Sequence, residues 1–173
     1  MIQGSTVSLR EWRDEDLPLL TSLRNDVTLQ GQLLARPRGS SVDHVRQWLA
    51  EKASDPSSSL LIIAEAGGKE AIGYVQLSKL GSFDRYAELG ICIHQDSRGR
   101  GRGLESINLI CDYARSTWAV RKMLLQVRAD NDPAIACYAK AGFQKCALLR
   151  AHAYIEGSYR DIVMMERLLD DRP

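Results

Sequence analysis

The sequence feature that most restricts the fold is a glycine-rich turn that joins a strand-like run to an amphipathic helix. The apolar run 89–93 leads through HQDSR to three glycines at alternate positions, after which apolar residues recur with helical spacing. The glycines are Gly99, Gly101 and Gly103. Because glycine has no Cβ, successive N–H groups can turn toward one ligand, and the start of the helix adds unpaired N–H groups and the positive end of its dipole. We therefore expect a phosphate-binding turn at residues 98–103.

Arginines occupy the positions between these glycines and support the same prediction. Arg98, Arg100 and Arg102 place up to three guanidinium groups beside the turn, although alternate residues of a tight turn need not face the same way. Two other interpretations stay open, an RNA-binding arginine-glycine segment and an ordinary solvated turn. Segments of the first kind are long and repeated, whereas this one lies between a strand and a helix. The glycine pattern of dinucleotide-binding folds and the G-K-[ST] of a P-loop are not met.

Hydrophobic periodicity along the rest of the chain predicts a mixed sheet flanked by helices. The expected strands are 5–11, 60–65, 71–79, 87–94, 122–128, 143–149 and 159–168, and the expected helices begin after Asp14 and Ser41 and span 103–117 and 131–141. The consecutive strands from 60 to 94 indicate an antiparallel meander, and Glu156-Gly157 indicates a turn in the last hairpin. Since neither an internal repeat nor a long linker divides the chain, we expect one domain over residues 1–173.

The composition narrows the classes of function. The 173 residues include 23 Lys and Arg against 22 Asp and Glu, a formal net charge of +1, so no overall field attracts nucleic acid or an anionic membrane. No apolar run reaches the ~18 to 20 residues that span a bilayer, and the first residues lack a secretory signal. We therefore expect a cytoplasmic protein without a nucleic-acid or membrane partner. The cysteines and histidines lack metal-ligand spacing, so no metal is expected. Cys92 is a candidate nucleophile, but no histidine occupies an obvious partner position.

Two motifs, read together, resemble those of the GNAT superfamily of acetyl-CoA-dependent N-acetyltransferases. The first pattern, [RQ]-x-x-G-x-[GA], is matched by RGRGRG at 98–103. The second, N-x-x-A-x-x-x-Y-x-K-x-G-F, is matched by NDPAIACYAKAGF at 131–143. In addition, AELGI at 87–91 resembles the fourth strand of the family, and YRD at 159–161 is similar to the close of the ribosomal-protein and spermidine acetyltransferase branches.

The resemblance implies both a fold and a co-substrate. The implied fold is α/β with a mixed sheet: a central, mostly antiparallel sheet of about seven strands, one splayed parallel pair, and about four flanking helices. The implied co-substrate is acetyl-CoA, with its pantetheine arm beside the fourth strand and its pyrophosphate on the glycine turn. The implied contacts are Ile91, Cys92, Ile93, Arg98, Gly99, Arg100, Gly101, Arg102, Gly103 and Asn131.

Acetyl transfer to an amine needs a neutral amine and a proton for the departing thiolate. Tyr138 matches the family position that gives a proton to the coenzyme A sulfur, and a phenol is protonated at neutral pH; the alternative is an aromatic residue that only packs. Glu88 matches a carboxylate that several branches use as general base, commonly through water; the alternative is an ordinary surface or ion-paired glutamate. His94 is a second candidate base.

Acceptor specificity in this superfamily comes mainly from the region between the first two helices and from the last hairpin, here 25–41 and 151–159. The first stretch carries Asp26, Arg36 and Arg38, whereas a polyamine pocket needs clustered carboxylates to pair with several ammonium groups. We expect direct attack, in a ternary complex, by a primary amine of a peptide or protein N-terminus, amino acid, amino sugar or other small amine, with an anion on the acceptor favoured by the arginines. The alternatives are a polyamine acceptor, a longer acyl donor, and a non-catalytic sensor that binds coenzyme A or RNA; a homodimer is left open.

Overall fold

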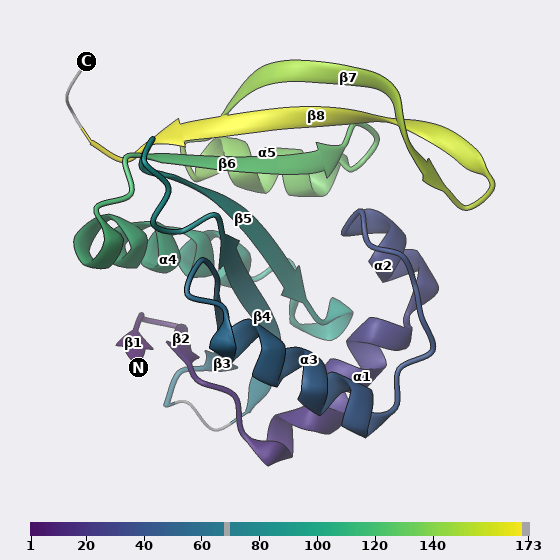
Figure 1. Ribbon diagram of the computed structural model, residues 1–173, viewed down its shortest axis with the longest axis vertical. Coiled ribbons are helices and arrows are strands. Elements are labelled where there is room, and N and C mark those ends of the chain that lie inside the picture. Colours follow the sequence, from purple (N-terminus) through teal and green to yellow (C-terminus); the bar gives the residue numbers. More distant parts are fainter. Residues whose placement is uncertain (68–69, 171–173) are drawn as a thin grey trace.

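A mixed sheet runs through the whole computed structural model, which describes residues 1–67 and 70–170 (Figure 1). In these residues eight strands pair in the order β1-β2-β3-β4-β5-β6-β8-β7, and neighbours are antiparallel except for the parallel pair β5 and β6. The strands are β1 (Ile2–Gln3), β2 (Val7–Arg10), β3 (Ser59–Glu65), β4 (Ala71–Ser78), β5 (Tyr86–Ile93), β6 (Lys122–Arg128), β7 (Gln144–Ile155) and β8 (Ser158–Leu168). The expected α/β fold with a mixed sheet is confirmed.

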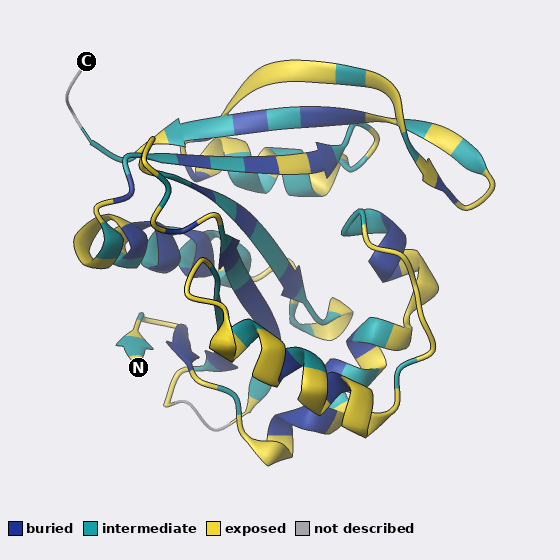
Figure 2. Ribbon diagram, viewed as in Figure 1, coloured by how far each residue is buried: buried dark blue, intermediate teal, exposed yellow. Residues whose placement is uncertain are grey.

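Helices cover both faces of the sheet. They are α1 (Leu17–Asn25), α2 (Val27–Gln32), α3 (Val42–Ser54), α4 (Arg102–Trp118) and α5 (Asp132–Lys140), with 3-10 turns at Asp14–Asp16 and Gln95–Ser97. One core joins α4 and α5 to the sheet, and a second core joins α1, α2 and α3 to Ile62, Tyr74 and Cys92 on the opposite face. Figure 2 shows these faces as buried segments of the strands and helices. Within the described residues, no helix combines the length and apolarity needed to cross a membrane.

The parallel strands β5 and β6 pair only where they begin. Their register joins residues 86–88 to residues 122–124. Beyond this point β5 remains paired with β4 as far as Ile93, and β6 remains paired with β8 as far as Arg128. The sheet therefore opens between the two strands, as Figure 1 shows, and the expected splayed parallel pair is confirmed.

Some elements depart from the sequence prediction. In the described residues β1 and α2 bring the strands to eight and the helices to five, where about seven and about four were expected. The sequence of α2, VTLQGQ, contains β-branched residues and a glycine, which are weak helix formers, and Asp26 caps it by accepting from the Leu29 N–H at 2.9 Å. Asp14 is not an N-cap, because it lies in a 3-10 turn and α1 begins at Leu17. Strand β7 continues past its expected end to Ile155.

A buried ion pair fixes the entry to α1. The two terminal nitrogens of Arg10 donate to the two carboxylate oxygens of Asp16 at 2.7 and 2.8 Å, and their side chains are only 4% and 3% exposed. The N–H of Arg13 donates to the same carboxylate at 2.8 Å. The hydrogen bond to Asp16 raises the pKa of Arg10 although burial opposes it. Removing the Asp16 carboxylate would take the opposite charge away from a buried guanidinium, so the pair holds β2 to the turn that precedes α1.

Candidate active site

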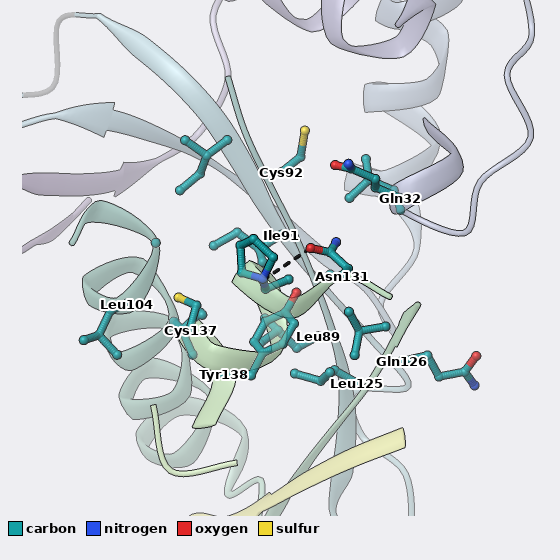
Figure 3. Close-up of a pocket in the computed structure, with 18 of the residues that line it drawn as sticks. Gln32, Leu89, Ile91, Cys92, Leu104, Leu125, Gln126, Asn131, Cys137 and Tyr138 are labelled. Carbon is teal, nitrogen blue, oxygen red and sulfur yellow. Dashed lines mark hydrogen bonds between the residues drawn. The ribbon is translucent and has the colours of Figure 1, made fainter. Parts of the chain in front are cut away.

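A cavity of about 680 Å³ occupies the opening between β5 and β6 (Figure 3). Both strands line it, together with α2, the glycine turn, α4 and α5. Both predicted motifs therefore meet at one place. The predicted site residues that line the cavity are Glu88, Ile91, Cys92, Ile93, Arg98, Gly99, Gly101, Gly103, Asn131 and Tyr138.

Side chains reach this cavity from both faces of the sheet, because successive residues of a strand point to opposite faces. Leu89 belongs to the core under α4, whereas Cys92 belongs to the core under α1, α2 and α3. In Figure 3, Gln32 of α2 lies on one side of β5, and Cys137 and Tyr138 of α5 lie on the other. Two molecules can thus meet in the cavity while each contacts a different face of the sheet.

The glycine turn presents its main chain to the cavity. Gly99 and Gly101 both have a φ of 75°, a left-handed conformation that favours glycine, and a Cβ at either position would meet nothing within 4 Å. Conformation rather than crowding therefore requires these two glycines. The first helical bond of α4 runs from the Glu105 N–H to the Gly101 oxygen at 3.0 Å, so the N–H groups of residues 102–104 have no partner inside the helix. This arrangement suits a phosphate group.

The three arginines of the turn differ in position. Arg98 lines the cavity, and its Nε donates to the Ile93 carbonyl at 2.9 Å, which ties the turn to the end of β5. Arg100 and Arg102 are not among the described residues that line the cavity. Arg100 is exposed, and a terminal nitrogen of Arg102 donates to Glu65 at 2.5 Å. Arg100 is thus exposed beside the turn and Arg102 is joined to β3, and the coenzyme contacts expected of these two residues stay predictions.

The main chain of β5 offers polar groups to the opening at alternate residues. The His94 N–H donates to β4 at 2.8 Å, so even-numbered residues direct their main-chain groups to β4. The carbonyl of Cys92 is on that side, only 2.1 Å from where a Cβ of Gly73 would stand. Ile91 and Ile93 therefore direct their main-chain groups toward the opening. The expected main-chain role suits Ile91 and Ile93 and does not suit Cys92.

Asn131 is both a helix cap and a cavity residue. Its Oδ1 accepts from the Ala134 N–H at 3.3 Å at the start of α5, the bond drawn as a dashed line in Figure 3. Pro133 occupies the first turn, where its missing N–H has no helical partner to lose. The cap orients the side chain and leaves the Nδ2 group, with its two donors, for a ligand in the cavity.

Tyr138 reaches the cavity from α5, where its ring lies 6.0 Å from the ring of Phe143. Burial raises the pKa of Tyr138 to about 12, and the thiols of Cys137 and Cys92 act in the same direction. The phenol is therefore protonated across the physiological range. It can donate a hydrogen bond or a proton to a group bound beside it.

Glu88 lines the cavity and is also ion-paired. Its Oε1 lies 2.8 Å from Nζ of Lys79, and both side chains are partly exposed. The hydrogen bond to Glu88 raises the pKa of Lys79, so Lys79 carries its positive charge at neutral pH. The Glu88 carboxylate therefore lies beside a cation, and its role as a general base stays a prediction.

The structure separates the other two candidate groups, since Cys92 is buried in a core and His94 lies outside the described cavity lining. Cys92 is 2% exposed and burial raises the pKa of its thiol to about 12, so it is not a ready nucleophile. His94 lines a second, polar hollow of about 450 Å³ and lies 3.7 Å from Asp96. In the part of the chain that the structure describes, no cluster of three or more His, Cys, Asp or Glu residues could hold a metal ion.

Sequence reasoning missed the amide side chains that line the α2 side of the cavity. These come from Gln32 in α2, Gln76 in β4 and Gln126 in β6. For Gln76 and Gln126, the available signal in the sequence was a glutamine between apolar residues of a strand, as in AIGYVQLS and KMLLQVR. Arg36 and Arg38, expected near the acceptor, are exposed and lie outside the described lining of the cavity, so they give no support for an anionic acceptor.

Comparisons with known proteins agree with this geometry. The family model of an acetyltransferase (GNAT) domain matches residues 6–144. The spermidine N(1)-acetyltransferase of Escherichia coli strain K12 is 28% identical over 165 residues, which cover 95% of this chain and 87% of that protein. The N-alpha-acetyltransferase RimI of Mycobacterium tuberculosis is 33% identical over 97 residues, 55% of this chain and 58% of that protein. The spermidine N-acetyltransferase of Vibrio cholerae, crystallised with CoA and spermine, superposes with a TM-score of 0.87 at 25% identity, over 96% of this chain and 97% of that one.

Proposed function

The chain belongs to the GNAT acetyltransferase family and is an acetyl-CoA-dependent N-acetyltransferase, and we propose that it acetylates a primary α-amine directly inside the cavity at the β5–β6 opening. One observation carries this proposal: the cavity is lined from both faces of the sheet, so donor and acceptor can meet there in a ternary complex. Direct transfer needs no nucleophile from the protein, which agrees with the buried, protonated thiol of Cys92. All strands of the described residues belong to one sheet, which supports a single catalytic domain.

Groups on the α4 and α5 side of the cavity fit acetyl-CoA, which supplies an activated acetyl thioester when bound. The glycine turn and the start of α4 would hold its diphosphate, with Arg98 beside them. The main chain of Ile91 and the Nδ2 of Asn131 would bind amides along its arm. The fit rests on donors that face the cavity and on the open space where a Cβ of Gly99 or Gly101 would stand.

Tyr138 is the proposed proton donor to the departing sulfur. Its phenol is protonated because burial raises its pKa to about 12. A thiolate released where little water reaches it is destabilised, so the sulfur would take a proton from a donor beside it.

The acceptor side favours an amine that is already neutral near pH 7.5. Among the described residues that line the cavity, Glu88 is the one carboxylate, and it is ion-paired with Lys79. A peptide α-amine has a pKa of ~7.7 to 8.0, so roughly a third of it is neutral at pH 7.5, against roughly one part in a thousand for a lysine-type amine. An α-amine therefore needs no strong base, and Glu88 would orient it by accepting a hydrogen bond.

The other residues on the acceptor side of the cavity suit an acceptor that has an apolar side chain next to an amide group. Leu29, Leu33 and Met164 supply apolar surface, while Gln32 and Gln76 supply groups that both donate and accept. A peptide that begins with an apolar residue matches both features. We therefore place such a peptide N-terminus first among the acceptors.

Polyamine acetylation is the second candidate, because the spermidine acetyltransferases of Escherichia coli and Vibrio cholerae align with nearly the whole chain. A polyamine carries several ammonium groups, whereas the described cavity lining offers them the one ion-paired carboxylate of Glu88. Charge complementarity therefore favours the α-amine.

Release of free thiol from acetyl-CoA tests the proposal with three amines at equal concentration. They are a leucyl-glycyl-glycine amide, an Nα-acetyl-lysine amide and spermidine. Preference for the leucyl peptide, with kcat/KM rising up to the pKa of its α-amine, is the expected result. Preference for spermidine would replace the proposal by its second candidate. Binding of coenzyme A without thiol release from any amine would support a sensor and overturn the proposed transfer.

A further inference from the structure

The tip of the last hairpin contacts α2, which carries Leu29 and Gln32 of the acceptor side of the cavity, through one side chain. Strand β7 is exposed along most of its length, as Figure 2 shows, and in this fully described strand Ile155 is the one buried residue, at 9% exposure. The two-residue turn that follows has a positive φ at both Glu156 and Gly157, which closes the hairpin tightly. Ile155 is thus held at a defined position at the end of the hairpin.

The residue that Ile155 meets is Gly31, in α2. A Cβ at Gly31 would lie 2.9 Å from Cγ2 of Ile155, closer than two such carbons approach. The φ of Gly31 is not positive, so its backbone conformation would accept alanine, and alanine is the better helix former. Close approach of the hairpin is therefore the reason for glycine at this position.

Charged groups surround the same contact. Nη1 of Arg128 and Oε1 of Glu156 each lie 3.9 Å from the position of that Cβ. Arg128, at the end of β6, also donates twice to Asp130, at 2.7 and 2.9 Å. The hairpin tip, the end of β6 and the loop that leads to Asn131 therefore meet at Gly31.

The consequence concerns the acceptor, because α2 and the residues that follow it carry Leu29, Gln32 and Leu33 into the cavity. We propose that the contact of Gly31 with Ile155 is a positioning contact. It sets the distance of α2, with its cavity residues, from β5, and so determines which acceptors fit. The inference rests on the proposed function, and it assigns a specificity role to two residues that do not line the cavity.

Gly31→Ala tests the inference, because its new methyl must displace either α2 or the hairpin. With the leucyl peptide amide as acceptor, we expect the acceptor KM to rise about tenfold, since displacements near 1 Å have effects of this order or more. The KM for acetyl-CoA should change less than twofold, because α4 and α5 hold that side of the cavity. Gly39→Ala is the matched control: a Cβ there meets nothing within 4 Å, and both KM values should stay within twofold.

Second-site variants separate this contact from a general loss of stability. Ile155→Ala removes Cγ2 and should return the acceptor KM of Gly31→Ala to within about threefold of the wild-type value. Ile155→Val retains Cγ2 and should give no rescue. Equal rescue by alanine and valine, an unchanged acceptor KM, or equal rises in both KM values would each overturn the inference.

Hydrogen exchange gives a readout that does not depend on activity. In Gly31→Ala, the amide hydrogens of α2 and of the hairpin tip should exchange faster, whereas those of α4 should exchange at the wild-type rate. Adding Ile155→Ala to this variant should restore slow exchange in α2. Unchanged exchange in α2 would overturn the inference. If the wild-type protein acetylates no amine, the proposed function fails, while the exchange experiment still decides whether this contact positions α2.

Discussion

Replacing Tyr138 by phenylalanine isolates the proton that the proposed mechanism assigns to the phenol. The ring and its contact with Phe143, 6.0 Å between centroids, are retained, so the change removes little more than the hydroxyl. Burial raises the pKa of the Tyr138 phenol from 10.0 to about 12, so the phenol stays protonated and available to the departing sulfur. General acid catalysis by a positioned side chain contributes about 10² to 10⁴ in rate, and this sets the loss expected when the hydroxyl is removed.

The assay is steady-state thiol release with saturating acetyl-CoA and the best acceptor. We expect kcat of Tyr138→Phe to fall by about 10² to 10³, within the range of general acid catalysis, while calorimetry gives an unchanged Kd for coenzyme A. Because burial raises the pKa of Tyr138 to about 12, the wild-type rate should show no loss from phenol ionisation between pH 7 and 10.

Tyr113→Phe serves as the control. This tyrosine packs edge-on against Trp118 in α4, with centroids 4.9 Å apart, and lies outside the cavity lining. Its loss of a hydroxyl should leave kcat unchanged. A fall of less than threefold in kcat of Tyr138→Phe, or an equal fall in Tyr113→Phe, would refute the assignment of the proton to Tyr138.

Three further predictions follow from the turn, the buried ion pair and the buried thiols. Gly101→Ala places a side chain at a φ of 75°, so the free turn should favour another conformation by about 1 to 2 kcal/mol, which coenzyme binding must reverse. Calorimetry should therefore show the Kd for coenzyme A rising about 5- to 30-fold. Arg102→Gln, which acts on Glu65 instead, should leave that Kd within twofold. Asp16→Asn takes the carboxylate charge away from the buried guanidinium of Arg10 and should lower the free energy of unfolding in urea by about 3 to 5 kcal/mol; a change below 1 kcal/mol would contradict the burial argument. Burial raises the pKa of Cys111 to about 11, so the folded state keeps a proton that the unfolded chain releases near pH 9. The contribution of this thiol to the free energy of unfolding is complete below pH 9 and is lost as pH rises through 11. A Tm that stays constant from pH 8 to 11 would contradict this prediction.

Local patterns predicted those parts of the site that lie within one continuous segment. The strand, turn and helix around Gly101, and the helix that carries Tyr138, are each determined by neighbours in the sequence, so periodicity and glycine placement predicted these elements. The roles expected of Asn131 and Tyr138 came from the resemblance to GNAT motifs. The partner of Arg102 was not predictable in this way, because Glu65 is distant in sequence and only the sheet brings it close.

Tertiary contacts also determined the elements that the sequence did not indicate. Helix α2 is short and has weak helix formers, and its position depends on the hairpin contact at Gly31. Strand β7 was expected to end at Leu149 but continues to Ile155. Its register with β8 shifts between Leu149 and Ala153, where the Ala151 N–H donates to Asp161 at 2.7 Å. A β-bulge of this kind interrupts the alternation on which strand prediction rests.

The short pairing of β5 with β6 divides the sheet mechanically into a five-strand part and a three-strand part that are joined through three residue pairs. Any relative twist of the two parts must be absorbed at this junction. A molecule that bonds to β5 and also contacts β6 would brace the parts against each other, so its binding should damp motion even at the distant edge strands. The entropy lost when the two parts stiffen is then a cost in the binding free energy of the first ligand. A second ligand that needs the same alignment would not pay this cost again, so it should bind more tightly after the first.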